Sequence, residues 1–225
     1  MEEGPPSFLK GQILHLGFLL IAIPVLSSFV EIGKGSWLGI PLFTWFWLCI
    51  SIPIAHQIYV WACWRMELRG QLITKKLGPN LGFKIYLIGF FILFGSRFLT
   101  LLFLAIADMG SIQLPLALQW IIGTPLVIIG GYGMYSIKTY FGFQRAAGID
   151  HFDPSYRDKP LVRQGIFRWT QNAMYVFVIQ LTWIFGVLGS SKLAMIGACF
   201  QTCYIWIHYF GTEKPDMNWI YGQKS

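Results

Sequence analysis

The chain has 225 residues, of which 55% are hydrophobic and only 12% carry a formal charge. A soluble domain carries about 25% charged residues, so this composition excludes a soluble globular domain and predicts a membrane protein. The formal net charge of +7 does not predict a nucleic-acid partner, because the basic residues follow the pattern of membrane topology.

Long uncharged intervals predict the membrane-spanning elements. Five intervals of 20 to 30 residues lack a formal charge, and a sixth candidate is interrupted only by Arg97; a bilayer span needs about 20 mostly apolar residues. The apolar runs are continuous rather than alternating, which favours helices over barrel strands. We therefore expect an all-α, polytopic membrane helical bundle in a single domain, residues 1–225. Its six transmembrane helices are predicted at 12–30, 37–64, 83–107, 116–137, 172–190 and 193–210.

The basic residues predict which side each end of the bundle faces. With six spans, 14 of the 17 Lys and Arg residues fall on the side of both termini. Lys34 and Lys192 fall on the opposite side, and Lys224 is counted with the C-terminal tail. Cytoplasmic segments carry an excess of Lys and Arg, so both termini are predicted to be cytoplasmic, in a bacterial inner membrane or the endoplasmic reticulum.

Polar residues concentrate in the long segment 138–171 and in the tail after residue 210. Connections of this length are usually functional or disordered, and the many aromatic residues of this one argue against disorder. We expect the segment and the tail to meet on the cytoplasmic face and to form a pocket that opens sideways to lipid.

Several motifs have both a structural and a functional interpretation. Gly131 and Gly133 either allow close helix packing or border a cofactor. Asn172 either caps a helix or, with Arg168, presents donors to an anionic group. Glu213 is either a solvated interface charge or a ligand of the site. A charge within a span normally faces the bundle interior, so Arg97 is assigned to a lipid phosphate, to snorkelling or to catalysis.

The order of these motifs resembles a family of membrane methyltransferases. The chain has a Gly-x-Gly helix, a long polar loop, Asn172-Ala173-Met174-Tyr175 and then Glu213-Lys214-Pro215. This order resembles the superfamily of phosphatidylethanolamine N-methyltransferase and isoprenylcysteine carboxyl methyltransferase, and the phospholipid branch is the closer one. The resemblance covers residues 56–76 and 120–225, and residues 120–225 are expected to form the methyltransferase core. Ala173 stands where this branch usually has proline, and Lys214 replaces its second glutamate.

By this resemblance the cofactor is S-adenosylmethionine, and no metal is expected. The residues implied to border the cofactor are Gly131, Gly133, Arg168, Gln171, Asn172, Met174, Tyr175, His208 and Glu213. Methyl transfer to an amine needs a base, for which Glu213, His151 and Asp150 are the candidates. The headgroup phosphate of a lipid substrate needs cations, for which Arg97, Arg145 and Arg163 are the candidates.

Three functions follow from these expectations. The first is N-methylation of the phosphatidylethanolamine headgroup toward phosphatidylcholine, with a membrane lipid as substrate. The second keeps the cofactor but uses an isoprenylcysteine carboxylate or a small thiol as acceptor; Asn172, where isoprenylcysteine enzymes have histidine, counts against it. The third is a non-enzymatic scaffold or transporter, which leaves the polar loop and tail unexplained. The sequence leaves the oligomeric state open.

Overall fold

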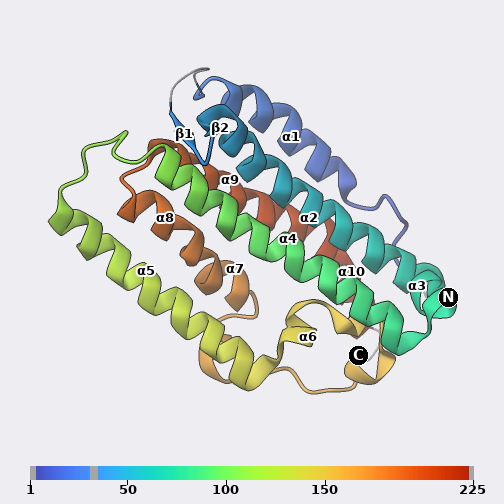
Figure 1. Ribbon diagram of the computed structural model, residues 1–225. Coiled ribbons are helices and arrows are strands. Elements are labelled where there is room, and N and C mark those ends of the chain that lie inside the picture. The colour runs from blue at the N-terminus through green and yellow to red at the C-terminus, as the bar shows by residue number, and fades with distance from the viewer. Residues whose placement is uncertain (1–3, 31–34, 223–225) are drawn as a thin grey trace.

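The computed structural model describes residues 4–30 and 35–222 of the chain. Lys34 and Lys224, which enter the predicted sidedness, lie outside these ranges. The described residues are mostly helical (Figure 1). The longer elements are α1 (Gln12–Ser27), α2 (Leu42–Gly70), α4 (Pro79–Ala107), α5 (Leu116–Ser136) and α9 (Lys192–His208). The shorter elements are β1 (Ser36–Trp37), β2 (Ile40–Pro41), α3 (Leu72–Leu77), η1 (Ile137–Phe141), α6 (Phe143–Ala146), η2 (Ile149–His151), η3 (Pro154–Tyr156), η4 (Gly165–Arg168), α7 (Ala173–Phe177), η5 (Val178–Thr182), α8 (Trp183–Leu188), η6 (Tyr209–Glu213) and α10 (Lys214–Gly222).

Four helical segments of the described chain are long and apolar enough to cross a membrane. They are Leu42–Gly70, Pro79–Ala107, Leu116–Phe141 and Lys192–Gly222. The predicted spans at 12–30 and 172–190 correspond to two shorter apolar segments, Gln12–Ser27 and Ala173–Leu188. The helical membrane architecture is therefore confirmed, while the total of six spans stays a prediction.

Two predicted helices differ from the observed ones in their continuity. The segment predicted at 172–190 is divided into α7, the 3₁₀ segment η5 and α8. The helix predicted to end at residue 210 instead continues through the π-turn η6 into α10 and reaches Gly222. Pro215 lies directly after this π-turn, as the second residue of α10, and does not stop the helix.

A short hairpin moves the start of the second predicted helix. Strands β1 and β2 pair antiparallel, with Trp37 opposite Ile40. Helix α2 consequently begins at Leu42 instead of residue 37 and runs on to Gly70. Its 29 residues exceed the roughly 20 that a bilayer span needs. The extra turns carry the end of α2 beyond the apolar core, to the end of the bundle where the polar segments lie.

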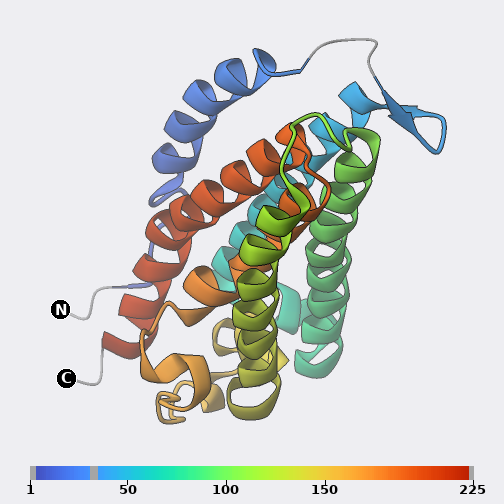
Figure 2. The same cartoon turned by 90° about the vertical axis from the view of Figure 1, so that its left-hand side faces the viewer.

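The bundle has a main apolar core and a polar end. Side chains of α2, α4 and α9 form the core, including Phe46, Leu101 and Ala198. The segment before α1, the end of α10, α3, α6 and the loop of residues 142–172 lie toward the same end of the bundle (Figures 1 and 2). This arrangement brings segments that are far apart in the sequence together around one site.

Hydrogen bonds and packing hold the polar loop against α2 and α4. The Tyr86 hydroxyl donates to the Ala147 carbonyl over 2.7 Å and accepts from Trp64 Nε1 over 2.9 Å. Gly148 has a φ of +85° and packs on the Trp64 ring, where an added Cβ would lie 2.4 Å from a ring carbon. Glycine is needed here because both the backbone conformation and the close approach exclude a larger residue. The loop is therefore an ordered cover, as expected from its aromatic content.

Candidate active site

A cavity lies beneath the polar loop, between α4 and α5. It is lined by the phenylalanines of α4 (Phe90, Phe91, Phe94, Phe98), by Met134 and Ile137 near the end of α5, and by residues of α2, α6, α7, η5 and α9. Its empty space, including the part open to the outside, is about 1230 Å³. The cavity combines an apolar aromatic lining with a few polar groups, as small-molecule sites do.

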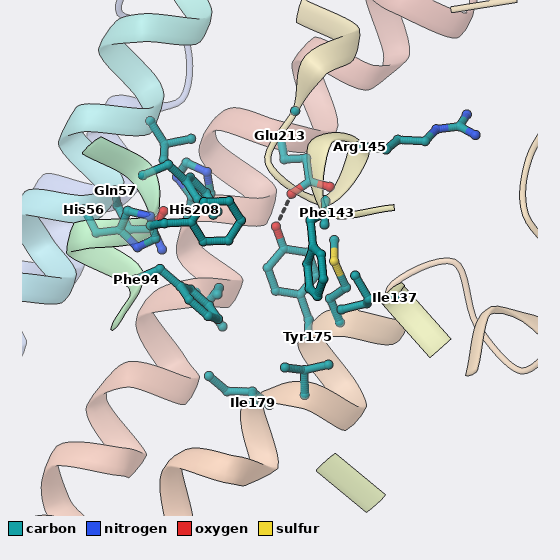
Figure 3. A pocket seen from close by; sticks show the side chains of 18 of the residues that line it. His56, Gln57, Phe94, Ile137, Phe143, Arg145, Tyr175, Ile179, His208 and Glu213 are labelled. Carbon is teal, nitrogen blue, oxygen red and sulfur yellow. Dashed lines mark hydrogen bonds between the residues drawn. The ribbon is translucent and has the colours of Figure 1, made fainter. Parts of the chain in front are cut away.

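Tyr175 and Glu213 meet in this cavity (Figure 3). The Tyr175 hydroxyl, on α7, donates a hydrogen bond to the Glu213 carboxylate at the end of η6. Tyr175 also packs against the rings of Trp206 and Tyr209. The contact joins α7 to the continuous helix of α9, η6 and α10. It therefore fixes a carboxylate beside an aromatic surface, which suits a cationic ligand.

Asp150 and Arg145 form part of the loop that covers the cavity. Arg145 Nε lies 3.7 Å from Asp150 Oδ2, and the Tyr221 hydroxyl of α10 donates to the same oxygen. Asp150 Oδ1 is buried and has no hydrogen-bond partner. In Figure 3 Arg145 lies on the opposite side of the cavity from His56 and His208. The loop thus supplies one carboxylate with an unused acceptor and one cation.

His151 lies behind this cover rather than in the cavity lining. Its ring stacks on Trp64 with the ring centroids 4.0 Å apart. Nδ1 lies 3.1 Å from the Gly148 carbonyl oxygen, and Nε2 lies 3.4 Å from Asp216 Oδ2. Both ring nitrogens therefore face groups of the protein, and this arrangement favours a positioning role over proton transfer in the cavity.

The cavity gathers many of the predicted site residues but not all of them. Those in its lining are Arg97, Arg145, Asp150, Met174, Tyr175, His208 and Glu213. Arg163, Arg168 and Gln171 are exposed on the segment before α7, outside the lining. Asn172 is half-buried at the start of α7, where its side chain makes no capping hydrogen bond.

The two glycines of the Gly-x-Gly pair have different surroundings. A Cβ added to Gly133 would lie 2.9 Å from Val178 Cγ2, so Gly133 allows α5 to pack closely on η5. Gly131 is exposed, and nothing lies within 4 Å of an added Cβ there. Neither glycine lines the cavity, and the packing interpretation of Gly133 is the one that its contacts support.

Sequence reasoning assigned no role to His56, Gln57 or the phenylalanines of α4, all of which line the cavity. The phenylalanines did carry a signal, because Phe90, Phe94 and Phe98 recur every four residues and must share one helix face. His56 and Gln57 gave none, since their proximity to the cavity depends on how α2 packs against α4 and α9. Among the described residues, no three His, Cys, Asp or Glu side chains are grouped as they would be around a metal ion.

The helical membrane architecture and the covered cavity define a class of polytopic membrane proteins with a site at one end of the bundle. Residues 118–224 match the model of a family described as phospholipid methyltransferase. This match confirms the resemblance to the membrane methyltransferases and to their phospholipid branch, and it supports, at the level of the family, a membrane phospholipid methyltransferase. Comparison with curated proteins and with solved structures gave no match.

Proposed function

We propose that the protein transfers methyl groups from S-adenosylmethionine to the amine of phosphatidylethanolamine, toward phosphatidylcholine. The observation that carries this proposal is the position of the cavity. The region matched by the family model supplies the Tyr175–Glu213 contact of this cavity, and α4, outside that region, supplies an apolar wall of phenylalanines. Such a site suits a polar cofactor together with an amphipathic acceptor.

The residues present fit the cofactor. S-adenosylmethionine supplies an electrophilic methyl group on a sulfonium and also carries an ammonium and a carboxylate. Glu213 and the unpartnered Oδ1 of Asp150 provide acceptors for the ammonium. The ring of Tyr175, which lines the cavity, provides an aromatic surface compatible with the sulfonium. Met174 and His208 complete the wall that adjoins these groups.

The amine of the acceptor must be neutral before it can attack the methyl group. Glu213 or Asp150 accepts its proton, because both carboxylates line the cavity whereas His151 does not. Arg145 supplies positive charge on the loop side of the cavity. Transfer from a sulfonium is a displacement reaction, so the protein contributes mainly position and electrostatics.

The proposed topology places the cavity near the cytoplasmic face. Of the 17 basic residues, 14 belong to the segments assigned to the side of the termini. Six crossings put the two termini, residues 65–84 and residues 138–168 on one side of the membrane. The positive-inside tendency then assigns the end with the polar loop to the cytoplasm, where the cofactor is supplied.

Replacement of Glu213 tests the proposed function. We expect Glu213→Gln to lower methyl transfer into phosphatidylethanolamine by about 100-fold or more, because it removes a charged group at the reacting centre. The measurement is transfer of labelled methyl groups into total lipid, with the mono-, di- and trimethylated headgroups separated. Asp153→Asn is the matched control, because it neutralises a carboxylate of the loop outside the cavity lining.

Two outcomes would contradict the proposal. Full activity of Glu213→Gln, in protein that remains inserted and folded, would remove Glu213 from the site. If the wild-type protein binds S-adenosylhomocysteine but labels no lipid, the acceptor is not phosphatidylethanolamine, and isoprenylcysteine and small thiols become the acceptors to test.

A further inference from the structure

Arg97 is a buried cation that has no carboxylate partner among the described residues. It lies on α4, about 15 Å along the helix from the end at Ala107, and it is 3% exposed. Its Nε donates to Gln201 Oε1 over 3.1 Å, and one terminal nitrogen lies 3.5 Å from His56 Nδ1. No Asp or Glu of residues 4–30 and 35–222 forms an ion pair with it.

The contact with Arg97 determines which nitrogen of His56 carries the proton. A guanidinium has only donors, so His56 Nδ1 must accept, and the neutral ring then carries its hydrogen on Nε2. This Nε2 is buried and has no hydrogen-bond partner. The His56 ring is held by edge contacts with Phe90 and Phe94, at centroid distances of 4.8 and 6.3 Å. The result is a fixed, unused N–H donor next to a guanidinium.

Arg97 and His56 both line the cavity of the proposed active site. Figure 3 shows His56 and His208 together on one side of the cavity, and His208 Nδ1 is likewise buried without a partner. Gln201 is itself fixed, because its amide nitrogen reaches the Cys49 carbonyl oxygen at 3.4 Å. A buried charge is costly unless it is paired, and among the described residues neither Arg97 nor the adjacent donor has a carboxylate partner.

We propose that Arg97 and His56 form a receptor for an anionic oxygen group of a molecule bound in the cavity. Two sources have this chemistry: the phosphodiester of a lipid substrate and the carboxylate of the methyl donor. Arg97, His56 and Gln201 come from three helices, and the first two lie outside the family match at residues 118–224. The choice of these two sources rests on the proposed function. The observation that Arg97 and His56 have donors without acceptors in the described part of the protein does not depend on that function.

The experiment measures binding without catalysis. The purified protein in maltoside detergent, which contains no phosphate, is titrated separately with dioleoyl phosphatidylethanolamine and with S-adenosylhomocysteine, and binding is measured as thermal stabilisation. Arg97→Gln removes the charge, and Arg97→Lys keeps it. Lys84→Gln is the matched control, because Lys84 is an exposed cation on the same helix outside the cavity.

We expect Arg97→Gln to weaken the binding of one probe by about tenfold or more, as expected for the loss of a hydrogen bond to a charged group. Arg97→Lys should show an intermediate loss, and Lys84→Gln none. Loss for the lipid alone identifies the phosphodiester as the anion, and loss for S-adenosylhomocysteine alone identifies the carboxylate. Without ligand, Arg97→Gln should melt no lower than the wild type, because it removes an unpaired buried charge.

The receptor is overturned if wild type and Arg97→Gln respond alike to both probes. It is also overturned if Arg97→Gln melts well below the wild type without ligand and His56→Leu, which removes the unused donor, leaves both affinities unchanged. A wild-type protein that binds a probe through Arg97 yet transfers no methyl group to lipid would contradict the proposed function alone and leave the receptor standing.

Discussion

Arg65 and Arg97 are both buried in the bundle, but their surroundings differ. Arg65, at the end of α2, is 0% exposed, and its Nε lies 2.8 Å from Asp216 Oδ1. Its terminal nitrogens also donate to the carbonyls of Ser7 and Lys10. The side chain of Arg97, in the middle of α4, has only an amide oxygen and an imidazole as partners within residues 4–30 and 35–222.

The difference in partners distinguishes a structural cation, Arg65, from a cation that is available to a ligand, Arg97. Arg65 joins the residues before α1 to α10, and Asp216 extends the connection to His151 of the polar loop. The terminal nitrogens of Arg65 donate to backbone carbonyls, and its charge is paired with that of Asp216. The charge of Arg97 is not, and its guanidinium lies at a cavity. Burial alone therefore does not indicate function; the combination of burial, missing countercharge and adjoining space does.

The largest effect is expected when the partner of Arg65 is removed. Asp216→Ala leaves Arg65 as an unpaired buried charge, and breaking a buried pair in this way costs about 3–5 kcal/mol. We expect a loss of stability of this size in denaturant titrations of the protein in detergent. Asp153→Ala, at a half-buried position of the loop, provides the control. A loss below about 1 kcal/mol for Asp216→Ala would show that Arg65 is compensated without Asp216.

A smaller effect is expected when a neutral partner of Arg97 is removed. Gln201→Leu leaves Arg97 Nε and the Cys49 carbonyl without the amide contact, which costs about 1–3 kcal/mol. If the cavity binds an anion at Arg97, a saturating ligand should recover part of this loss, whereas no ligand should recover the loss in Asp216→Ala. Melting curves with and without ligand measure both. Gln180→Leu, whose side-chain amide contacts only the Val176 carbonyl of its own segment, is the control.

The sequence indicated the fold more completely than the site. Apolar runs identify membrane helices because the bilayer imposes length and composition on them, and four helical segments of the described chain are long and apolar enough to cross a membrane. The breaks within residues 173–188 and the continuation through η6 were not predicted. Both depend on tertiary packing, such as the close approach of Gly133 to Val178, which local composition does not encode.

The site shows the same limit. The motif residues Tyr175, His208 and Glu213 were predicted to lie together, and they line one cavity. His56 could not be assigned to that cavity from the sequence, because its role depends on contacts between distant residues. Arg97 is 41 residues from His56 in the sequence, and Gln201 is 104 residues from Arg97. Asn172 and Arg168 were predicted to present hydrogen-bond donors at the start of a long helix. The helix that begins there, α7, is only five residues long.

The smallest loss of stability is expected at the edge of the loop, where the Asp150 carboxylate has two partners. Tyr221 donates to Asp150, and Arg145 lies 3.7 Å from the same carboxylate. Tyr221→Phe removes one of two partners at a half-exposed position, so we expect a loss of about 0.5–1.5 kcal/mol. Tyr135→Phe, on the exposed face of α5, should change stability by less than about 0.5 kcal/mol. Equal losses for Asp216→Ala and Tyr221→Phe would contradict the comparison, because the cost of losing a partner should rise with burial and fall with the number of partners that remain.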